Sequence, residues 1–158
     1  PQLYPALTVM ENMLVAMACH ENKLSMWRPS SNKEHLARGA DLLERFGLSQ
    51  HSQRRVKELP GGIRKLLDIA LAMTGEPRLL LLDEPCAGLS PAERHRLADI
   101  IAALPRSITM LMIEHDMDIA LAMADRVTVM HQGAVILDGT ANDAREDQRV
   151  KEVYFGQI

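Results

Sequence analysis

The sequence predicts an α/β fold with a mainly parallel sheet, flanking helices and an additional α-helical part. Two short apolar runs, Leu79–Leu82 and Ile108–Ile113, have the length and composition of buried strands in a sheet that helices cover on both faces. A stretch with helical signals lies between them. We therefore expect a mostly α-helical subdomain in residues 1–75 and the α/β core in residues 76–158.

The composition is that of one globular domain. The chain has 158 residues, of which 47% are hydrophobic and 25% charged, and this gives no reason to expect disorder. A formal net charge of −3 gives no electrostatic reason to expect nucleic acid or an anionic membrane as a direct partner. Cys19 and Cys86 form no C-x-x-C pattern, so a reducing, cytosolic location is the simplest interpretation.

No segment predicts insertion into a membrane. No stretch approaches the roughly 18 consecutive apolar residues that a spanning helix needs. The first five residues have no charged region before an apolar segment, so they do not predict a signal peptide. Any work at a membrane would therefore depend on docking to a spanning partner.

Helix signals dominate the first part of the chain. Thr8 and Glu11 have the spacing of a capping box at a helix start. A methionine-rich stripe follows, which is typical of a core, although a deformable contact surface for another protein is the alternative. The stripe consists of Met10, Met13, Leu14 and Met17. A second helix is predicted from about Lys33 to Phe46, after a loop at residues 27–32 and with Gly47 at its end.

Asp83 and Glu84 stand at the end of the first apolar run, and Pro85 stops the strand there. The carboxyl ends of parallel strands are where open α/β sheets bind their ligands. Adjacent carboxylates in an apolar setting are costly unless a cation or a proton relieves them. Magnesium held by Asp83, with Glu84 taking a proton from water, would relieve both, and a plain acidic turn is the alternative.

Two further segments contain residues that could bind an anion or a phosphate. Gly61 and Gly62 precede a helix predicted from Ile63, and glycines that open a helix leave backbone N–H groups available to an anion. The alternative is a glycine-rich helix entry without a ligand. His115 follows the second apolar run, where it could serve packing or be directed toward a phosphate.

The remaining elements have local start and turn signals. Ser90, Pro91 and Glu93 predict the N-cap, first position and capping-box partner of a helix that runs to about Leu104. A short helix is predicted over residues 117–124. Two strands at 126–131 and 134–137 are joined through Gln132–Gly133 as a hairpin candidate, and residues 138–140 begin a helical tail.

Together, four segments resemble the motifs of ABC-type ATPases in the order and approximate spacing of that family. L-L-L-L-D-E-P at 79–85 resembles the Walker B strand, residues 86–90 resemble the D-loop and residues 113–116 the switch-histidine segment. Residues 59–65 lie where the family carries its signature loop. The L-P-G-G and A-G-L-S-P-A-E sequences are similar to the branch that energises the import of branched-chain amino acids and urea.

The resemblance implies roles for individual residues. Asp83 would bind magnesium, Glu84 would polarise the attacking water and His115 would sense the γ-phosphate of ATP. The nucleotide-binding residues that it implies are Pro60, Gly61, Gly62, Ile63, Gly88 and Ser90. The loop departs from the common L-S-G-G-Q because Pro60 replaces the serine and Ile63 the glutamine, so contact with phosphate would depend on the glycine backbone.

The resemblance also implies a partial P-loop-NTPase-like core. None of the nine glycines lies in a G-x-x-x-x-G-K-[ST] pattern. The chain therefore resembles the C-terminal part of an ABC ATPase, and its use of ATP and Mg²⁺ would require the missing N-terminal part. We expect this chain alone to be inactive. The alternative function is a non-catalytic fragment that retains only docking and self-association surfaces.

The expected partners follow from the same resemblance. They are transmembrane permease subunits and a second ATPase subunit in a homo- or heterodimer, at the cytoplasmic, inner face of the cell membrane. Loss of the P-loop strand would leave an apolar sheet edge open, which predicts self-association. An ABC ATPase of the DNA-repair or translation type is a more distant alternative, because neither a coiled-coil insertion nor a basic surface is visible.

Overall fold

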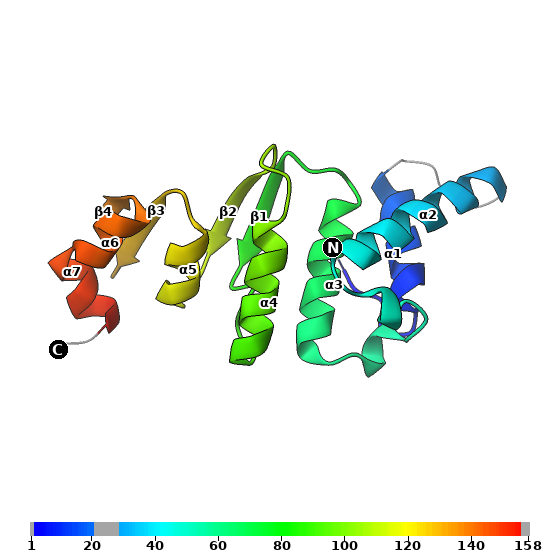
Figure 1. The fold of residues 1–158 in the computed structure, drawn as a ribbon, viewed down its shortest axis with the longest axis horizontal. Coiled ribbons are helices and arrows are strands. Elements are labelled where there is room, and N and C mark those ends of the chain that lie inside the picture. Colours follow the sequence, from blue (N-terminus) through cyan, green and yellow to red (C-terminus); the bar gives the residue numbers. More distant parts are fainter. Residues whose placement is uncertain (1, 21–28, 156–158) are drawn as a thin grey trace. The chain divides into compact units, whose positions relative to one another are not determined.

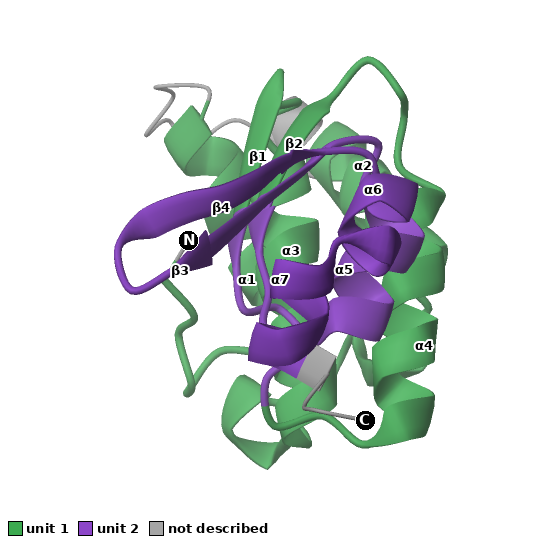
Figure 2. Cartoon of the chain, turned by 90° about the vertical axis from the view of Figure 1, so that its left-hand side faces the viewer, with its two compact units in different colours: residues 1–81, 88–111 green, residues 82–87, 112–158 purple. Residues whose placement is uncertain are grey.

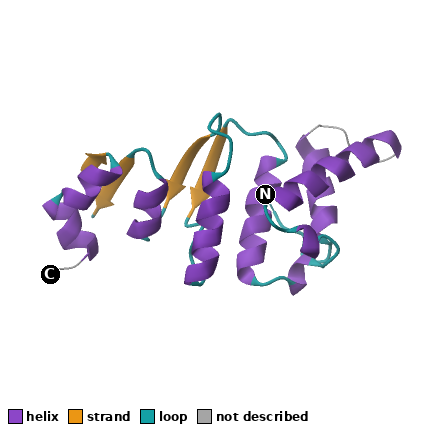
Figure 3. Cartoon of the chain, in the orientation of Figure 1, coloured by secondary structure: helices purple, strands orange, loops and turns teal. Residues whose placement is uncertain are grey.

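The computed structural model describes residues 2–20 and 29–155, which form an α/β structure (Figure 3). The helices are α1 (Val9–His20), α2 (Pro29–Arg45), α3 (Gly61–Met73), α4 (Pro91–Ala102), α5 (Met117–Met123), α6 (Ala141–Glu146) and α7 (Gln148–Val150). The strands are β1 (Leu79–Asp83), β2 (Thr109–Ile113), β3 (Val127–His131) and β4 (Ala134–Gly139). Two 3-10 turns, η1 (Ser49–His51) and η2 (Val56–Glu58), precede α3, and a π-helical segment, η3 (Lys151–Phe155), follows α7.

The chain divides into two compact units, which Figure 2 shows in different colours. Unit 1 contains residues 1–81 and 88–111, and unit 2 contains residues 82–87 and 112–158. The boundary runs through β1 and β2. The division into a helical subdomain and a core at residue 75 stays a prediction. None of the helices formed by residues 2–20 and 29–155 has the length and apolar content that crossing a membrane requires.

The helices α1, α2 and α3 pack against one another in unit 1 (Figure 1). Met13 and Met17 of α1 are buried, so the methionine-rich stripe contributes to the core, as its commoner interpretation predicts. Leu43 of α2 and Phe46, directly after this helix, are buried. This helix begins at Pro29 rather than at Lys33, and proline suits a first helical turn because its position there needs no N–H partner. The predicted loop at 27–32 is therefore wrong from residue 29 onward. Residues 27 and 28 lie outside the described part of the chain.

The start of α1 is fixed by polar side chains. The Thr8 N–H donates to Glu11 Oε2 (2.6 Å) and the Glu11 N–H donates to Thr8 Oγ1 (3.2 Å), which confirms the predicted capping box. Asn12 is buried, and its amide accepts from the Tyr4 N–H (2.8 Å) and donates to the Tyr4 and Thr8 carbonyl oxygens. Because each polar atom of this amide has a partner, its burial carries little penalty and the segment before α1 is anchored to the helix.

The strands β1 and β2 form a parallel pair with α4 as the crossover. The Thr109 N–H donates to the Arg78 carbonyl (2.9 Å) and the Glu84 N–H donates to the Ile113 carbonyl (2.9 Å), so the partners advance in the same direction. The cap of α4 is as predicted, with Ser90 as N-cap, Pro91 at the first position and a complete capping box.

In this strand pair only one face of β1 is buried and no residue of β2 is, which contradicts the prediction of strands buried on both faces. Leu80 and Leu82 are buried. On the alternate positions large apolar side chains are exposed: Leu79 by 53%, Leu81 by 65%, Leu111 by 61% and Ile113 by 61%. An uninterrupted apolar run indicates a strand, but burial on its second face needs a second layer. Within the described residues, β1 has a strand neighbour on one side only, which is β2.

Unit 2 is built on the β3–β4 hairpin. Gln132 and Gly133 both have positive φ, 48° and 79°, as a tight two-residue hairpin turn requires, so the predicted hairpin is confirmed. Strand β4 extends to Gly139, and the Thr140 capping box then starts α6. The hairpin and the three helices after β2 share one apolar cluster. Its buried side chains are Val129 of β3, Leu121 of α5, Ala144 of α6 and Val150 of α7.

Asp147 makes one part of unit 2 sensitive to acid. The Arg149 guanidinium, followed by the Val150 and Arg149 backbone N–H groups, lowers the pKa of this carboxyl from 3.8 to about 2. A lowered carboxyl pKa stabilises the folded state above the unfolded value, and this contribution is lost as the pH falls from about 4 through 2. We expect carboxyl NMR to give a midpoint near 2. In Arg149→Gln the midpoint should return toward 3.8, and an unchanged midpoint there would contradict the assigned cause.

Candidate functional site

Glu84, directly after β1, has a strained backbone. Its φ is 43°, in the left-handed region that side chains other than Asn and Asp rarely adopt. Its N–H donates to the Ile113 carbonyl (2.9 Å), and its own carbonyl accepts from the Ala87 N–H (3.1 Å). Such a conformation costs about 1–3 kcal/mol and persists where neighbouring structure enforces it, often at functional sites.

His115, directly after β2, lies beside Glu84. Its Nδ1 is 3.4 Å from Glu84 Oε1, and the two side chains are 66% and 50% exposed. The two residues predicted to be catalytic are therefore in contact at the carboxyl ends of adjacent parallel strands. Asp83 is also exposed, so the expectation that the carboxylate pair lies in an apolar setting is wrong. These side chains are open to a ligand in water instead.

Asp83 fits the predicted role in magnesium binding by its chemistry. Mg²⁺ prefers hard oxygen ligands and is usually bound by one or two carboxylates together with substrate phosphates. An exposed carboxylate that ends a parallel strand provides such an oxygen. The role of Asp83 as a metal ligand stays a prediction.

Glu114 is a polar residue of this region to which the sequence patterns assigned no role. Its Oε1 accepts from the Cys86 N–H (2.8 Å), and its Oε2 accepts from the His115 N–H (3.1 Å) and the Asp116 N–H (3.4 Å). Asp116 in turn caps α5 by accepting from the Ile119 N–H (3.3 Å). The sequence gives only a weak indication of this role for Glu114, because a carboxylate before a histidine occurs in many different structural contexts.

The signature-like loop leads into α3 in unit 1. Pro60 is the N-cap residue without a side-chain cap, and the helix begins at Gly61, two residues before the predicted start at Ile63. The first N–H groups of a helix have no partner within the helix, so the backbone at Gly61–Ile63 can receive an anion. This supports the view that phosphate contact would depend on backbone rather than on side chains.

Gly62 lies against the start of α4. A Cβ at Gly62 would overlap Glu93 Oε1 and lie 3.3 Å from Leu89 Cδ2. The Glu93 carboxylate cannot move freely, because its Oε2 accepts from the Ser90 hydroxyl (2.7 Å) and the Ser90 N–H (2.9 Å). These hydrogen bonds also lower the pKa of Glu93. Unit 1 therefore brings the signature-like loop and the end of the D-loop-like segment together, with Gly88 in a left-handed conformation (φ 74°) in that segment.

This contact predicts different effects for the two adjacent glycines. Gly62→Ala should displace the Glu93 carboxylate and disrupt the capping box of α4. Loss of this cap should lower the free energy of unfolding by about 1 kcal/mol. Gly61→Ala is the matched control, since a Cβ there meets nothing within 4 Å. Urea unfolding followed by circular dichroism measures both. Equal stabilities of the two variants would show that the contact is not restrictive.

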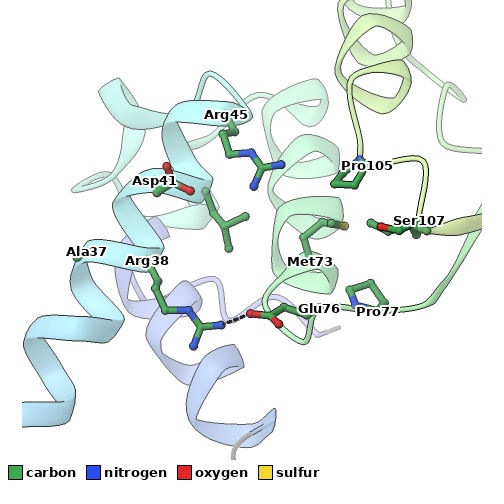
Figure 4. Close-up of a pocket in the computed structure, with 11 residues that line it drawn as sticks. Ala37, Arg38, Asp41, Arg45, Met73, Glu76, Pro77, Pro105 and Ser107 are labelled. Atoms are coloured by element: carbon green, nitrogen blue, oxygen red, sulfur yellow. Dashed lines mark hydrogen bonds and ion pairs between the residues drawn. The ribbon is translucent and has the colours of Figure 1, made fainter.

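An open cavity of about 570 Å³ lies elsewhere in unit 1 (Figure 4). Side chains of α2 and α3 line it together with residues 76–77, 105 and 107–108, and the Arg38 guanidinium contacts Glu76 there at 3.0 Å. None of the residues predicted for the site lines this cavity. It is therefore not the predicted nucleotide site.

Comparison with known proteins shows the family. The sequence model of the ABC transporter family matches residues 1–87, more than half of the chain. The chain is 36% identical to the high-affinity branched-chain amino acid transport ATP-binding protein LivG of Salmonella typhimurium and 36% identical to BraF of Pseudomonas aeruginosa. Each alignment covers 99% of this chain and 65% of the relative, so the chain spans about 65% of their length.

A solved structure of an ABC transporter cassette is similar to this chain in fold. The ADP conformation of MJ1267, an ATP-binding cassette of an ABC transporter, superposes with a TM-score of 0.79 at 32% sequence identity. The match covers 97% of this chain and 64% of that one. The α/β fold with a parallel strand pair is therefore the fold of these cassettes. The chain belongs to the ABC transporter family.

Proposed function

We propose that this chain is the C-terminal part of an ABC-type ATPase subunit that couples ATP hydrolysis to the import of a solute, with branched-chain amino acids, other amino acids or urea as the candidates. The observation that supports the proposal most directly is the 3.4 Å contact between Glu84 and His115 at the carboxyl ends of β1 and β2. Exposure of both side chains leaves room for a phosphate and a water molecule beside them.

The residues divide the chemistry between them. Asp83 supplies one carboxylate oxygen to Mg²⁺, which offsets the charge of the phosphates when bound. The Glu84 carboxylate accepts a hydrogen bond from the attacking water, orients it and takes its proton. The His115 imidazole donates an N–H to an oxygen of the γ-phosphate while its other nitrogen is oriented by a neighbouring carboxylate.

The glycine loop has a separate role in this proposal. Gly61 and Gly62 present backbone N–H groups at the start of α3 to the nucleotide bound by a second ATPase subunit. Pro60 and Ile63 flank this contact, and Gly88 and Ser90 shape the neighbouring segment before α4. The loop completes the partner's site rather than one on its own chain.

ATP hydrolysis by two polypeptides tests the proposal. The 158-residue chain alone is expected to show no magnesium-dependent turnover, because none of its nine glycines lies in a P-loop pattern. A polypeptide that joins a P-loop segment of an ABC cassette to the start of the same chain should hydrolyse ATP. Turnover by the chain alone that Glu84→Gln abolishes would contradict the first expectation, and an inactive but folded joined polypeptide would contradict the second.

A non-catalytic fragment is the second candidate function, and the absent P-loop pattern favours it for the chain alone. In this case only docking and self-association surfaces would operate. Retained binding to a transmembrane permease, with no gain of ATPase activity in the joined polypeptide, would favour this candidate over the first.

We also propose where the chain acts and what it binds. Its partners are permease subunits and a second ATPase subunit at the cytoplasmic face of the membrane, without nucleic acid. The isolated chain self-associates through the open edge of β1, which pairs only with β2 among the described strands. The exposed side chains Leu79 and Leu81 of β1 and Leu111 of β2 add apolar surface beside this edge. Light scattering that gives a monomer at all concentrations would contradict this self-association.

A further inference from the structure

Two cross-links join the segment after β1 to the segment after β2. The first is the hydrogen bond from the Glu84 N–H to the Ile113 carbonyl (2.9 Å). The second is made by the Glu114 carboxylate, which accepts from the Cys86 N–H on one segment and from the His115 N–H on the other. The Glu84 and His115 side chains project from the backbone that these cross-links hold together.

Only a carboxylate can make the second cross-link in the observed form. Glu114 Oε1 faces the Cys86 N–H at 2.8 Å, and Oε2 faces the His115 and Asp116 N–H groups at 3.1 and 3.4 Å. All three partners are donors, so both oxygens must be acceptors. Glutamine offers one acceptor oxygen and one NH₂ group, and would leave one side of the cross-link without its hydrogen bond. Hydrogen bonds from N–H groups to a charged acceptor are also stronger than neutral ones.

We propose that Glu114 is a positioning residue: its carboxylate holds the segment at Cys86 beside the segment at His115 and thereby keeps the Glu84 carboxylate in contact with the imidazole. The catalytic consequence rests on the function proposed above. Glu114 touches neither substrate nor metal in this scheme, and acts through the geometry of Glu84 and His115. A displacement of about 1 Å between such groups can reduce a rate by about 10²-fold.

Nuclear magnetic resonance of the chain itself tests the geometry without requiring activity. In Glu114→Ala, hydrogen exchange of the Cys86 and His115 amides should increase about 10- to 100-fold. In Glu114→Gln, exchange should increase on one side only, and this isosteric variant also serves if Glu114→Ala fails to fold. Glu146→Ala, which removes an exposed carboxylate of the same unit, is the matched control and should change neither amide. Unchanged exchange in the folded Glu114 variants would overturn the proposal.

The imidazole provides a readout that a purely structural role would not change. Glu84→Gln should shift the ring signals of His115 in the otherwise natural chain, because the two side chains are 3.4 Å apart. In the Glu114→Ala background the same substitution should leave the ring signals almost unchanged. A full response of the ring in that background would show that Glu114 does not hold the pair together.

Kinetics of the joined polypeptide then test the catalytic consequence. Glu114→Ala should lower kcat about 10²-fold with little change in KM for ATP, and should have no further effect when His115 is already alanine. If Glu114→Ala lowered kcat equally with His115 present and with His115 replaced by alanine, Glu114 would not act through His115. If the joined polypeptide is inactive, the proposed function fails, while the amide exchange and ring signals still decide whether Glu114 positions the pair.

Discussion

Glu84→Gln in the joined polypeptide is expected to lower kcat for ATP hydrolysis about 10²- to 10⁴-fold, with KM for ATP little changed. The carboxamide fills the same space and keeps a hydrogen bond to water, but it cannot accept the proton that the attacking water loses. The fold should be unaffected, because the side chain is 50% exposed and the backbone bonds of residue 84 do not involve it. Steady-state hydrolysis at saturating magnesium measures the effect.

Glu76→Gln is the matched control for this variant. Glu76 also has a positive φ, 48°, and an exposed carboxylate that contacts a cation, Arg38. Its neutralisation should leave kcat within about twofold of the natural sequence, because no predicted site residue lies in its contact. Equal losses in both variants would point to a general charge effect, and full activity of Glu84→Gln would exclude Glu84 as the base.

Leu67→Ala is expected to destabilise the chain by about 2–5 kcal/mol, the usual range for a fully buried leucine. Leu67 has 0% exposure and lies in α3, which packs against α1 and α2. The loss combines the apolar contacts of the deleted atoms with the cavity that remains. Urea unfolding of the isolated chain, followed by circular dichroism at 222 nm as a general helix signal, should show a clearly lower midpoint.

Leu81→Ala controls for leucine truncation in general. This side chain is 65% exposed on the open face of β1, so its loss should change stability by no more than about 0.5 kcal/mol. Measurement at two protein concentrations separates a role in self-association from a role in folding. A large, concentration-independent loss in Leu81→Ala would contradict the open face, and a negligible loss in Leu67→Ala would contradict the position of the core.

Features that depend on neighbouring residues in the sequence could be predicted. The capping boxes at Thr8 and Ser90 and the hairpin turn at Gln132–Gly133 form between groups only a few residues apart. Their geometry is therefore determined by local residue types and spacing. The start of α2 was missed because Pro29 is compatible with both a loop and a first helical turn.

Features that depend on tertiary contacts could be predicted only in part. An apolar run such as Leu79–Leu82 indicates a strand, but the number of layers that cover it is not encoded in the run itself. The site pair Glu84 and His115 could be expected from two strand ends in one parallel pair. The bridging role of Glu114 could not, because hydrogen bonds from one side chain to three backbone N–H groups follow no sequence periodicity.

The left-handed backbone of Glu84 has an evolutionary consequence. Selection for folding alone would favour glycine at this turn, since glycine adopts a φ of 43° without a steric penalty. Glycine would remove the carboxylate, so under the proposed function stability and ATP hydrolysis make opposite demands on residue 84. Directed evolution of the chain for thermal stability alone is therefore expected to replace Glu84 by glycine early.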